Sequence, residues 1–257
     1  MKKVIKNIIK KKNKRKLVCL TAYSKPIAKI LDKHCDIVLV GDSIATTVYG
    51  MKNTHAVTLE MIIHHAKSVS SNLEKALCVV DMPINTYKNI KDAKKNAKLI
   101  IKKTNCDAVK IESNNKNFNI IKSLIKIGIP VMGHIGYTPQ NFKSFKVQGI
   151  DEAEEKKLIL EAQKIEAAGA FSIVLECIRE KTSKKITQKV KIPTIGIGAS
   201  INCDGQILVT DDMIGLSGFY PRFVKKYFKI DKVIENSVQK YKNDVIKKKF
   251  KSKKNNF

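Results

Sequence analysis

The chain has 257 residues, 43% of them apolar, and no apolar run approaches the about 20 residues of a membrane span, so we expect one soluble domain and no membrane partner. Its net charge of +27 arises from 50 basic against 23 acidic residues, yet only three of the basic residues are arginines and the lysines are spread along the chain. Surfaces that bind phosphates cluster their basic residues and favour arginine, so this pattern argues against a nucleic-acid partner.

The first predicted element is a basic amphipathic helix over residues 1–16. Val4, Ile5, Ile8 and Ile9 share one face at helical spacing, and the polar residues between them break up the apolar stretch that a signal peptide needs. We therefore expect this helix to pack on the domain rather than to direct export. Six scattered cysteines without a Cys-x-x-Cys pair are typical of a reducing compartment, which predicts a cytoplasmic protein.

Eight short apolar runs alternate with longer amphipathic stretches along the rest of the chain. This alternation is typical of parallel strands that are buried on both faces and joined by helices. Eight such units in this length predict an α/β fold, a (β/α)8 TIM barrel, as a single domain over residues 1–257 with a basic, disordered tail over 243–257. The predicted strands are 17–20, 36–41, 76–81, 107–112, 130–135, 171–176, 193–198 and 206–210.

Helix boundaries are marked most clearly in the second half of the chain. Asp151 with Glu154 three residues later is a capping pattern, and Gly169 is a typical C-terminal glycine, so this stretch predicts one long helix. Thr138 followed by Pro139 shows the same kind of start, a cap with proline in the first turn, and predicts that another helix begins there.

Acidic residues stand at the ends of three neighbouring strands: Asp42, Asp81 and Glu112. In a barrel of this type the carboxyl ends of the strands form the active site, so we expect the three carboxylates to converge. Oxygen ligands suit Mg²⁺, which takes one or two protein carboxylates together with water and substrate oxygens. Each acid could instead cap the helix that follows it, a common role for one aspartate and a less favoured one for three successive strand ends.

Three further side chains at strand ends are candidates for the same site. Lys110 lies two residues before Glu112, hence on the same face of its strand, and either binds an anionic substrate or pairs with Glu112. His134 either hydrogen-bonds the substrate or satisfies a buried carbonyl group. Glu176 ends an otherwise apolar run, which suits a general acid or base.

The segments "VGDS", "DMP", "VKIE", "GHIGYTPQ" and "VLE" occur in an order and spacing that resemble the ketopantoate hydroxymethyltransferase family, from about residue 17 to beyond 223. The resemblance implies an enzyme that transfers a hydroxymethyl group from 5,10-methylenetetrahydrofolate to 3-methyl-2-oxobutanoate. The product would be 2-dehydropantoate, in pantothenate biosynthesis. Members of this family usually assemble from dimers into a decamer, so the resemblance also implies a homo-oligomer.

The resemblance assigns roles by motif position. It implies that Asp42 and Asp81 are Mg²⁺ ligands, with Glu112 completing the site directly or through water, and that Glu176 is the proton acceptor. The implied substrate contacts are Asp42, Ser43, Asp81 and Lys110. With Mg²⁺ bound, the keto acid would lose its C3 proton and the resulting enolate would attack the methylene group of the folate.

Four places depart from the family pattern: Ser24, Ala45–Thr46, Ser113–Asn114 and Ser200. They flank the implied site without removing a charged group, so they bear on loop closure and folate fit more than on reaction type. Two other functions stay open: a Mg²⁺-dependent aldolase or lyase for another 2-oxo acid, which would need no folate, and a basic binding protein without catalytic activity.

Overall fold

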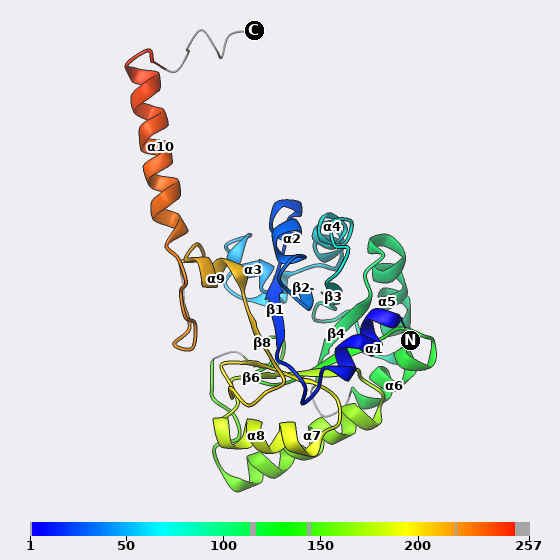
Figure 1. Ribbon diagram of the computed structural model, residues 1–257. Helices are drawn as coiled ribbons and strands as arrows, with labels where there is room; N and C mark the ends of the chain where they lie inside the picture. Colours follow the sequence, from blue (N-terminus) through cyan, green and yellow to red (C-terminus); the bar gives the residue numbers. More distant parts are fainter. Residues whose placement is uncertain (1, 114–116, 143–144, 219, 250–257) are drawn as a thin grey trace. The chain divides into compact units, whose positions relative to one another are not determined.

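The computed structural model describes residues 2–113, 117–142, 145–218 and 220–249. It divides into two units, Met1–Val209 and Thr210–Phe257. The first unit is a closed barrel of eight parallel strands with helices around it (Figure 1), which confirms the predicted (β/α)8 fold. The assignment of all 257 residues to a single domain stays a prediction.

All eight predicted strands are confirmed to within two residues at each end. Each strand pairs in parallel with the next, and β8 pairs with β1 to close the barrel. The strands are β1 (Leu17–Thr21), β2 (Ile37–Val40), β3 (Leu77–Asp81), β4 (Ala108–Glu112), β5 (Val131–Gly136), β6 (Ser172–Glu176), β7 (Thr194–Ile197) and β8 (Gly205–Leu208).

Helices follow most of the strands and cover the outside of the barrel. They are α2 (Lys25–Leu31), α3 (Ile44–Thr47), α4 (Leu59–Ser70), α5 (Ile90–Thr104), α6 (Phe118–Lys126), α7 (Glu152–Ala167) and α8 (Glu180–Lys189), with a 3-10 turn η1 (Thr54–Ala56). The predicted start of α7 is confirmed, because Asp151 Oδ1 accepts the N–H of Glu154 at 2.8 Å and Glu154 Oε2 accepts that of Gly149 at 2.9 Å.

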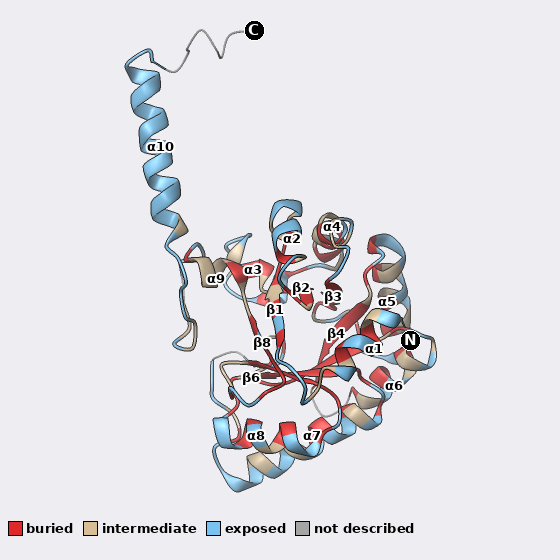
Figure 2. Ribbon diagram, in the orientation of Figure 1, coloured by how far each residue is buried: buried red, intermediate tan, exposed pale blue. Residues whose placement is uncertain are grey.

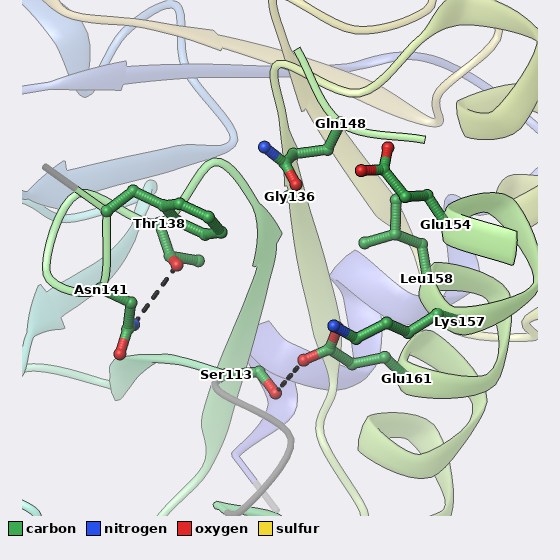
Figure 3. Close-up of a pocket in the computed structure, with 10 residues that line it drawn as sticks. Ser113, Gly136, Thr138, Asn141, Gln148, Glu154, Lys157, Leu158 and Glu161 are labelled. Atoms are coloured by element: carbon green, nitrogen blue, oxygen red, sulfur yellow. Dashed lines mark hydrogen bonds between the residues drawn. The ribbon is translucent and has the colours of Figure 1, made fainter. Parts of the chain in front are cut away.

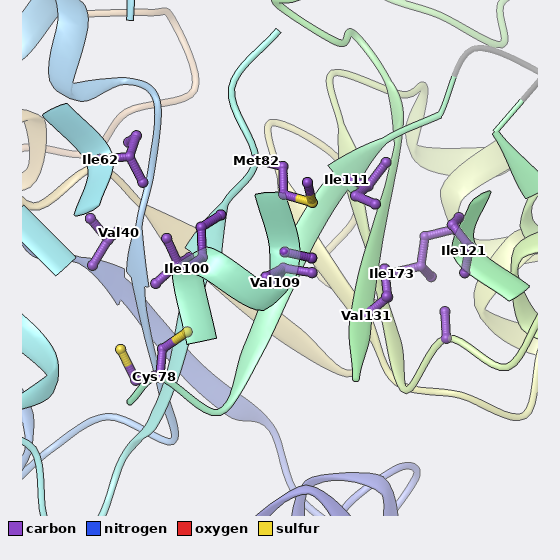
Figure 4. Packing of buried hydrophobic residues seen from close by; sticks show 14 of the residues in the cluster. Val40, Ile62, Cys78, Met82, Ile100, Val109, Ile111, Ile121, Val131 and Ile173 are labelled. Carbon is purple, nitrogen blue, oxygen red and sulfur yellow. The ribbon is translucent and has the colours of Figure 1, made fainter. Parts of the chain in front are cut away.

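The strands β2 to β6 are buried on two faces, whereas β1 and β8 have exposed residues on one face, Val18 and Gln206. Val109 and Ile111 of β4 belong to the core between the sheet and the helices, together with Ile100 of α5 and Ile121 of α6 (Figure 4). Ala108 of the same strand points the other way, into a second apolar cluster that fills the barrel. Side chains alternate along a strand, so every second residue of β4 faces the interior.

The predicted N-terminal helix is present as α1 (Lys3–Lys10), shorter than the predicted 1–16 because residues 11–14 form turns, and it packs where the strands begin. Ile5 and Ile8 are buried in the interior cluster beside residues that open the strands, such as Leu17. Past the helix end, Lys11 Nζ lies 2.6 Å from Asp36 Oδ1. This confirms that the amphipathic segment packs on the domain.

The second unit contains α9 (Thr210–Ile214) and α10 (Ile230–Ile246). None of the residues of α10 is buried (Figure 2). The prediction of a disordered tail from residue 243 was wrong for 243–246, because Val238, Tyr241 and Val245 continue a helical spacing to the end of α10. Residues 250–257 of that tail lie outside the described residues. No helix in the described ranges is both long and apolar enough to cross a membrane.

Candidate active site

Six ionisable side chains meet at the carboxyl ends of β2 to β6, and we call them the strand-end cluster. Its members are Asp42, Asp81, Lys110, Glu112, His134 and Glu176. All are buried except Glu176, whose side chain is 15% exposed. The cluster lies at the end of the barrel opposite α1, where the chemistry of such barrels is located. The structure therefore brings together the charged residues singled out in the sequence, while their roles stay predictions.

Lys110 pairs with Asp81 rather than with Glu112. Its Nζ lies 2.9 Å from Asp81 Oδ1, while Asp81 Oδ2 accepts the backbone N–H of Asp42 at 3.0 Å. Burial disfavours the charge of Lys110, but the Asp81 carboxylate and its neighbours outweigh burial and hold the pKa of Lys110 above its usual value. The lysine is therefore a fixed positive charge, and the Lys110–Glu112 pair considered from the sequence is not formed.

His134 lies between two carboxylates. Its Nε2 is 3.1 Å from Glu176 Oε2, and its Nδ1 is 3.6 Å from Glu112 Oε1. Burial and the charge of Lys110 lower the pKa of His134, the two flanking carboxylates raise it, and the net result is a pKa of about 9. Neither ring nitrogen hydrogen-bonds a carbonyl group of the described ranges, which argues against one of the two alternatives that the sequence left open.

The three acids of β2 to β4 do not cap the helices that follow them. Ser43 precedes α3 and Asn117 precedes α6, both without a side-chain cap, while the Asn89 side chain caps α5. Burial raises the pKa of Asp42 to about 8, and the charges of Asp81 and Glu112 add to the increase. The carboxylates are thus turned toward one another at an electrostatic cost, an arrangement that favours binding a cation.

The charge of this donor set matches that of Mg²⁺. When all six side chains are ionised, the four carboxylates, Lys110 and His134 have a net charge of −2. One divalent cation balances that charge. Among the described residues Glu112 Oε1 has no hydrogen-bond partner and only His134 Nδ1 near it at 3.6 Å, and Asp81 Oδ1 has only its ion pair with Lys110. No group of three His, Cys, Asp or Glu side chains among the described residues is arranged as a metal cage. The excess of two negative charges and the unbonded Glu112 oxygen fit a Mg²⁺ site with one or two protein ligands, completed by water and substrate.

The sequence interpretation missed Gln140 and gave its segment the wrong structure. Thr138–Pro139 begins no helix, since residues 138–141 form a turn in which the N–H of Asn141 binds Thr138 O. The turn directs the backbone N–H of Gln140 to Glu112 Oε2 at 3.0 Å. A polar residue shortly after a strand end was the available signal, but the helix-start pattern concealed it.

A cavity of about 260 Å³ lies beside the strand-end cluster, between the ends of β4 and β5 and the helix α7 (Figure 3). Ser113 lines it and donates to Glu161 Oε1 at 2.6 Å. Asn141 also lines it and donates to Glu112 Oε2 at 3.3 Å, which links the cavity to the cluster. Ser113 is one of the departures from the family pattern, and its hydroxyl hydrogen-bonds Glu161 of α7. Its neighbour Asn114 lies outside the described residues.

The other departures are local. Ser24 precedes α2 without a side-chain cap, and Thr46 within α3 donates to Ser43 O at 3.1 Å. Ser200 Oγ accepts the N–H of Asn202 at 3.1 Å in the β7–β8 loop. Ser43 itself is hydrogen-bonded to the Tyr23 hydroxyl at 2.7 Å. None of these contacts involves a charged member of the strand-end cluster.

Comparisons with known proteins agree over the length of the chain. A family model described as ketopantoate hydroxymethyltransferase matches residues 2–253. The chain is 54% identical over 257 residues to a 3-methyl-2-oxobutanoate hydroxymethyltransferase of Pelagibacter ubique, covering 100% of both chains. It is 47% identical to one of Thermosipho africanus, covering 98% of this chain and 97% of the other. Among solved structures, a 2,3-dimethylmalate lyase shares the fold, with a TM-score of 0.65, 13% identity and coverage of 100% and 89%.

Proposed function

Because this chain belongs to the ketopantoate hydroxymethyltransferase family, we propose that it transfers a hydroxymethyl group from 5,10-methylenetetrahydrofolate to 3-methyl-2-oxobutanoate, forming 2-dehydropantoate for pantothenate biosynthesis. The observation that carries the proposal is the strand-end cluster, which gathers buried acids, a fixed cation and a histidine at one end of the barrel. A binding protein without catalytic activity would have no need to bury these charges at a cost in stability.

In this proposal Asp42 and Asp81 hold Mg²⁺, and Glu112 completes the site directly or through water. When bound, Mg²⁺ polarises the carbonyl group of the keto acid and stabilises the negative charge that develops on its oxygen. Lys110 would pair with the substrate carboxylate, because it is buried and keeps its charge. Ser43, held by the Tyr23 hydroxyl, would donate to the same carboxylate.

Glu176 would remove the proton from C3 of the keto acid. Its carboxylate is the most accessible of the cluster, and His134 holds it from one side at 3.1 Å. The C3–H bond breaks with the proton passing to Glu176, and C3 then forms a bond to the methylene carbon of the folate as one of its two C–N bonds breaks. Water replaces the second C–N bond and supplies the hydroxyl oxygen of the product. The proton held by Glu176 and one proton of that water end on the two folate nitrogens, and tetrahydrofolate leaves.

The competing function is a Mg²⁺-dependent lyase for another 2-oxo acid. The likeness to 2,3-dimethylmalate lyase concerns the fold alone, so it does not favour that chemistry. The match of both sequence and length to the hydroxymethyltransferases favours the transferase.

Proton NMR of 3-methyl-2-oxobutanoate in D₂O, with enzyme and Mg²⁺, tests the proposal. We expect exchange of the C3 proton without folate and hydroxymethylated product once 5,10-methylenetetrahydrofolate is added. Enzyme boiled before the assay is the control. If a folded, Mg²⁺-loaded sample gives neither exchange nor product, the proposed function is wrong, and exchange without folate-dependent product would favour the lyase.

Family membership also supports a homo-oligomer, a decamer built from dimers, and a cytoplasmic location. Light scattering coupled to size-exclusion chromatography measures the assembled mass directly. A monomer at assay concentration would contradict the oligomer.

A further inference from the structure

One amide side chain connects three strand ends in the candidate site. Gln140, in the loop after β5, donates from Nε2 to Asp42 Oδ2 at 2.8 Å and to Met82 O at 3.1 Å. Its backbone N–H donates to Glu112 Oε2 at 3.0 Å. Gln140 is buried, and its side-chain oxygen, side-chain nitrogen and backbone N–H all have partners within the protein. It therefore touches two of the three carboxylates that the proposed function assigns to Mg²⁺.

The oxygen of this amide is held by Tyr87, in the loop between β3 and α5. The Tyr87 hydroxyl donates to Gln140 Oε1, and the tyrosine is itself buried. The carbonyl of Met82 only accepts hydrogen bonds, and so does the carboxylate of Asp42 in the ionised form that would bind a cation, so the amide nitrogen has to face them. In that form a flipped amide would lose both of these hydrogen bonds, because its oxygen would then face two acceptors.

We propose that Tyr87 and Gln140 are positioning residues that hold Asp42 and Glu112 in the arrangement Mg²⁺ requires, an inference that rests on the proposed function. Like-charged carboxylates that share a buried site repel one another, and a neutral donor fixed between them keeps both in place without neutralising either. Binding one oxygen of Asp42 to the amide leaves its other oxygen for the cation. Neither residue would touch the metal or the substrate.

The test is a double-mutant cycle read out by Mg²⁺ binding in calorimetry, without substrate. Tyr87→Phe removes only the hydroxyl that bonds the amide oxygen, and Gln140→Met removes the amide with little change in length. Partners of metal ligands typically contribute about 10–100-fold in metal affinity, so we expect Mg²⁺ binding to weaken at least about tenfold in each variant. Because Tyr87 acts through Gln140, adding Tyr87→Phe to Gln140→Met should weaken binding no further.

Tyr49→Phe is the matched control, since the Tyr49 hydroxyl bonds His65 Nε2 at 2.9 Å and contacts no member of the strand-end cluster. It should bind Mg²⁺ like the wild type. Thermal unfolding without Mg²⁺ records any loss of stability separately. A further readout is turnover, in which Tyr87→Phe should lower kcat and recover in part at high Mg²⁺.

Two results would overturn the inference: Tyr87→Phe binding Mg²⁺ as tightly as Tyr49→Phe, or the losses of the two substitutions adding in the double variant. A lower unfolding temperature with unchanged Mg²⁺ affinity would show a structural role only, and would also overturn it. If Tyr87→Phe fails to fold, the Mg²⁺ affinity of Gln140→Met compared with that of Tyr49→Phe decides whether the inference holds. The proposed function is judged on the wild type, whose folate-dependent turnover does not depend on either variant.

Discussion

The charged neighbour of each residue in the strand-end cluster, and its exposure, decide whether that residue is suited to binding or to proton transfer. Lys110 is buried with Asp81 at 2.9 Å, whereas Glu176 is partly exposed with His134 at 3.1 Å. A buried charge with a close partner is a binding element, while a carboxylate open to the site can accept a proton. This contrast separates the predicted ligands from the predicted base.

The first prediction concerns Asp42 and Asp81. Asp→Asn at either position keeps the shape but removes one negative charge, so Mg²⁺ binding should weaken and activity should fall, with partial recovery at high Mg²⁺. Titrating activity against Mg²⁺ concentration measures the shift. If neither variant changes the Mg²⁺ dependence, the ligand assignment is wrong.

The second prediction concerns Glu176. Glu176→Gln keeps the volume but cannot accept a proton, and general bases typically contribute about 10²–10⁴-fold in rate. The variant should bind Mg²⁺ and keto acid in calorimetry, while C3 exchange and product formation both collapse. Glu155→Gln, which removes a carboxylate paired with Lys185 between α7 and α8, is the control and should be active. Exchange near the wild-type rate in Glu176→Gln would contradict the assignment, and loss of transfer alone would move Glu176 to the folate step.

At the scale of secondary structure, α1 and α2 stabilise the end of the barrel remote from the cluster. Ile5 and Ile8 of α1 fill the interior where the strands begin. Asp32, at the end of α2, accepts three backbone N–H groups of the segment that leads into β3. These elements therefore affect the free energy of unfolding more than they affect catalysis.

The third prediction concerns truncation of a buried side chain of α1. Ile8→Ala leaves a cavity in the barrel interior, and such substitutions typically cost about 2–5 kcal/mol. Denaturant unfolding should show this loss, whereas turnover at low temperature should stay near the wild-type value. Ile201→Ala, at a side chain that is 81% exposed, should change stability by less than about 0.5 kcal/mol. A stability equal to that of the wild type in Ile8→Ala would show that α1 does not pack as described.

The fourth prediction is a pH dependence at Asp32. Burial disfavours ionisation of Asp32, but the three backbone donors outweigh burial and hold its pKa below the usual value. A pKa that is lower in the folded state means that ionised Asp32 contributes stability above about pH 4, and that this contribution is lost as the pH falls through the folded-state pKa. Asp32→Asn should therefore reduce the free energy of unfolding by roughly 1 kcal/mol near neutral pH. The difference from the wild type should shrink at about pH 3, and an equal difference at both pH values would contradict the argument.

For the whole molecule, the net charge of +27 is spread over exposed lysines rather than gathered at the active site. Lys247, Lys248 and Lys249, which follow α10, are all exposed. Exposed charges are screened beyond a Debye length of about 8 Å at physiological salt. The charge is therefore consistent with compositional drift in the sequence.

The fifth prediction tests that interpretation. Replacing Lys247, Lys248 and Lys249 together with glutamine should leave turnover nearly unchanged at physiological salt. Steady-state kinetics at that salt, with wild type measured in parallel, is sufficient. A large loss of activity would show that this basic surface has a function.

Local patterns were enough to predict the barrel and most of its charged site. Eight apolar runs identified the strands, and side-chain alternation put Lys110 and Glu112 on one inward face, because both depend on residues close in the chain. Asp42, Asp81 and Glu176 could be recognised because an acid at the end of an apolar strand has few structural roles.

Only the tertiary structure decided which of these groups pair. Lys110 binds Asp81 because β3 and β4 are neighbours with those two residues in register, and His134 lies between acids of two other strands. Gln140 meets Asp42 across 98 positions of sequence. No local pattern encodes that distance, because closure of the barrel brings loops together that the chain keeps far apart. The turn at 138–141 is held by those same contacts, which is why a helix-start pattern there was overruled.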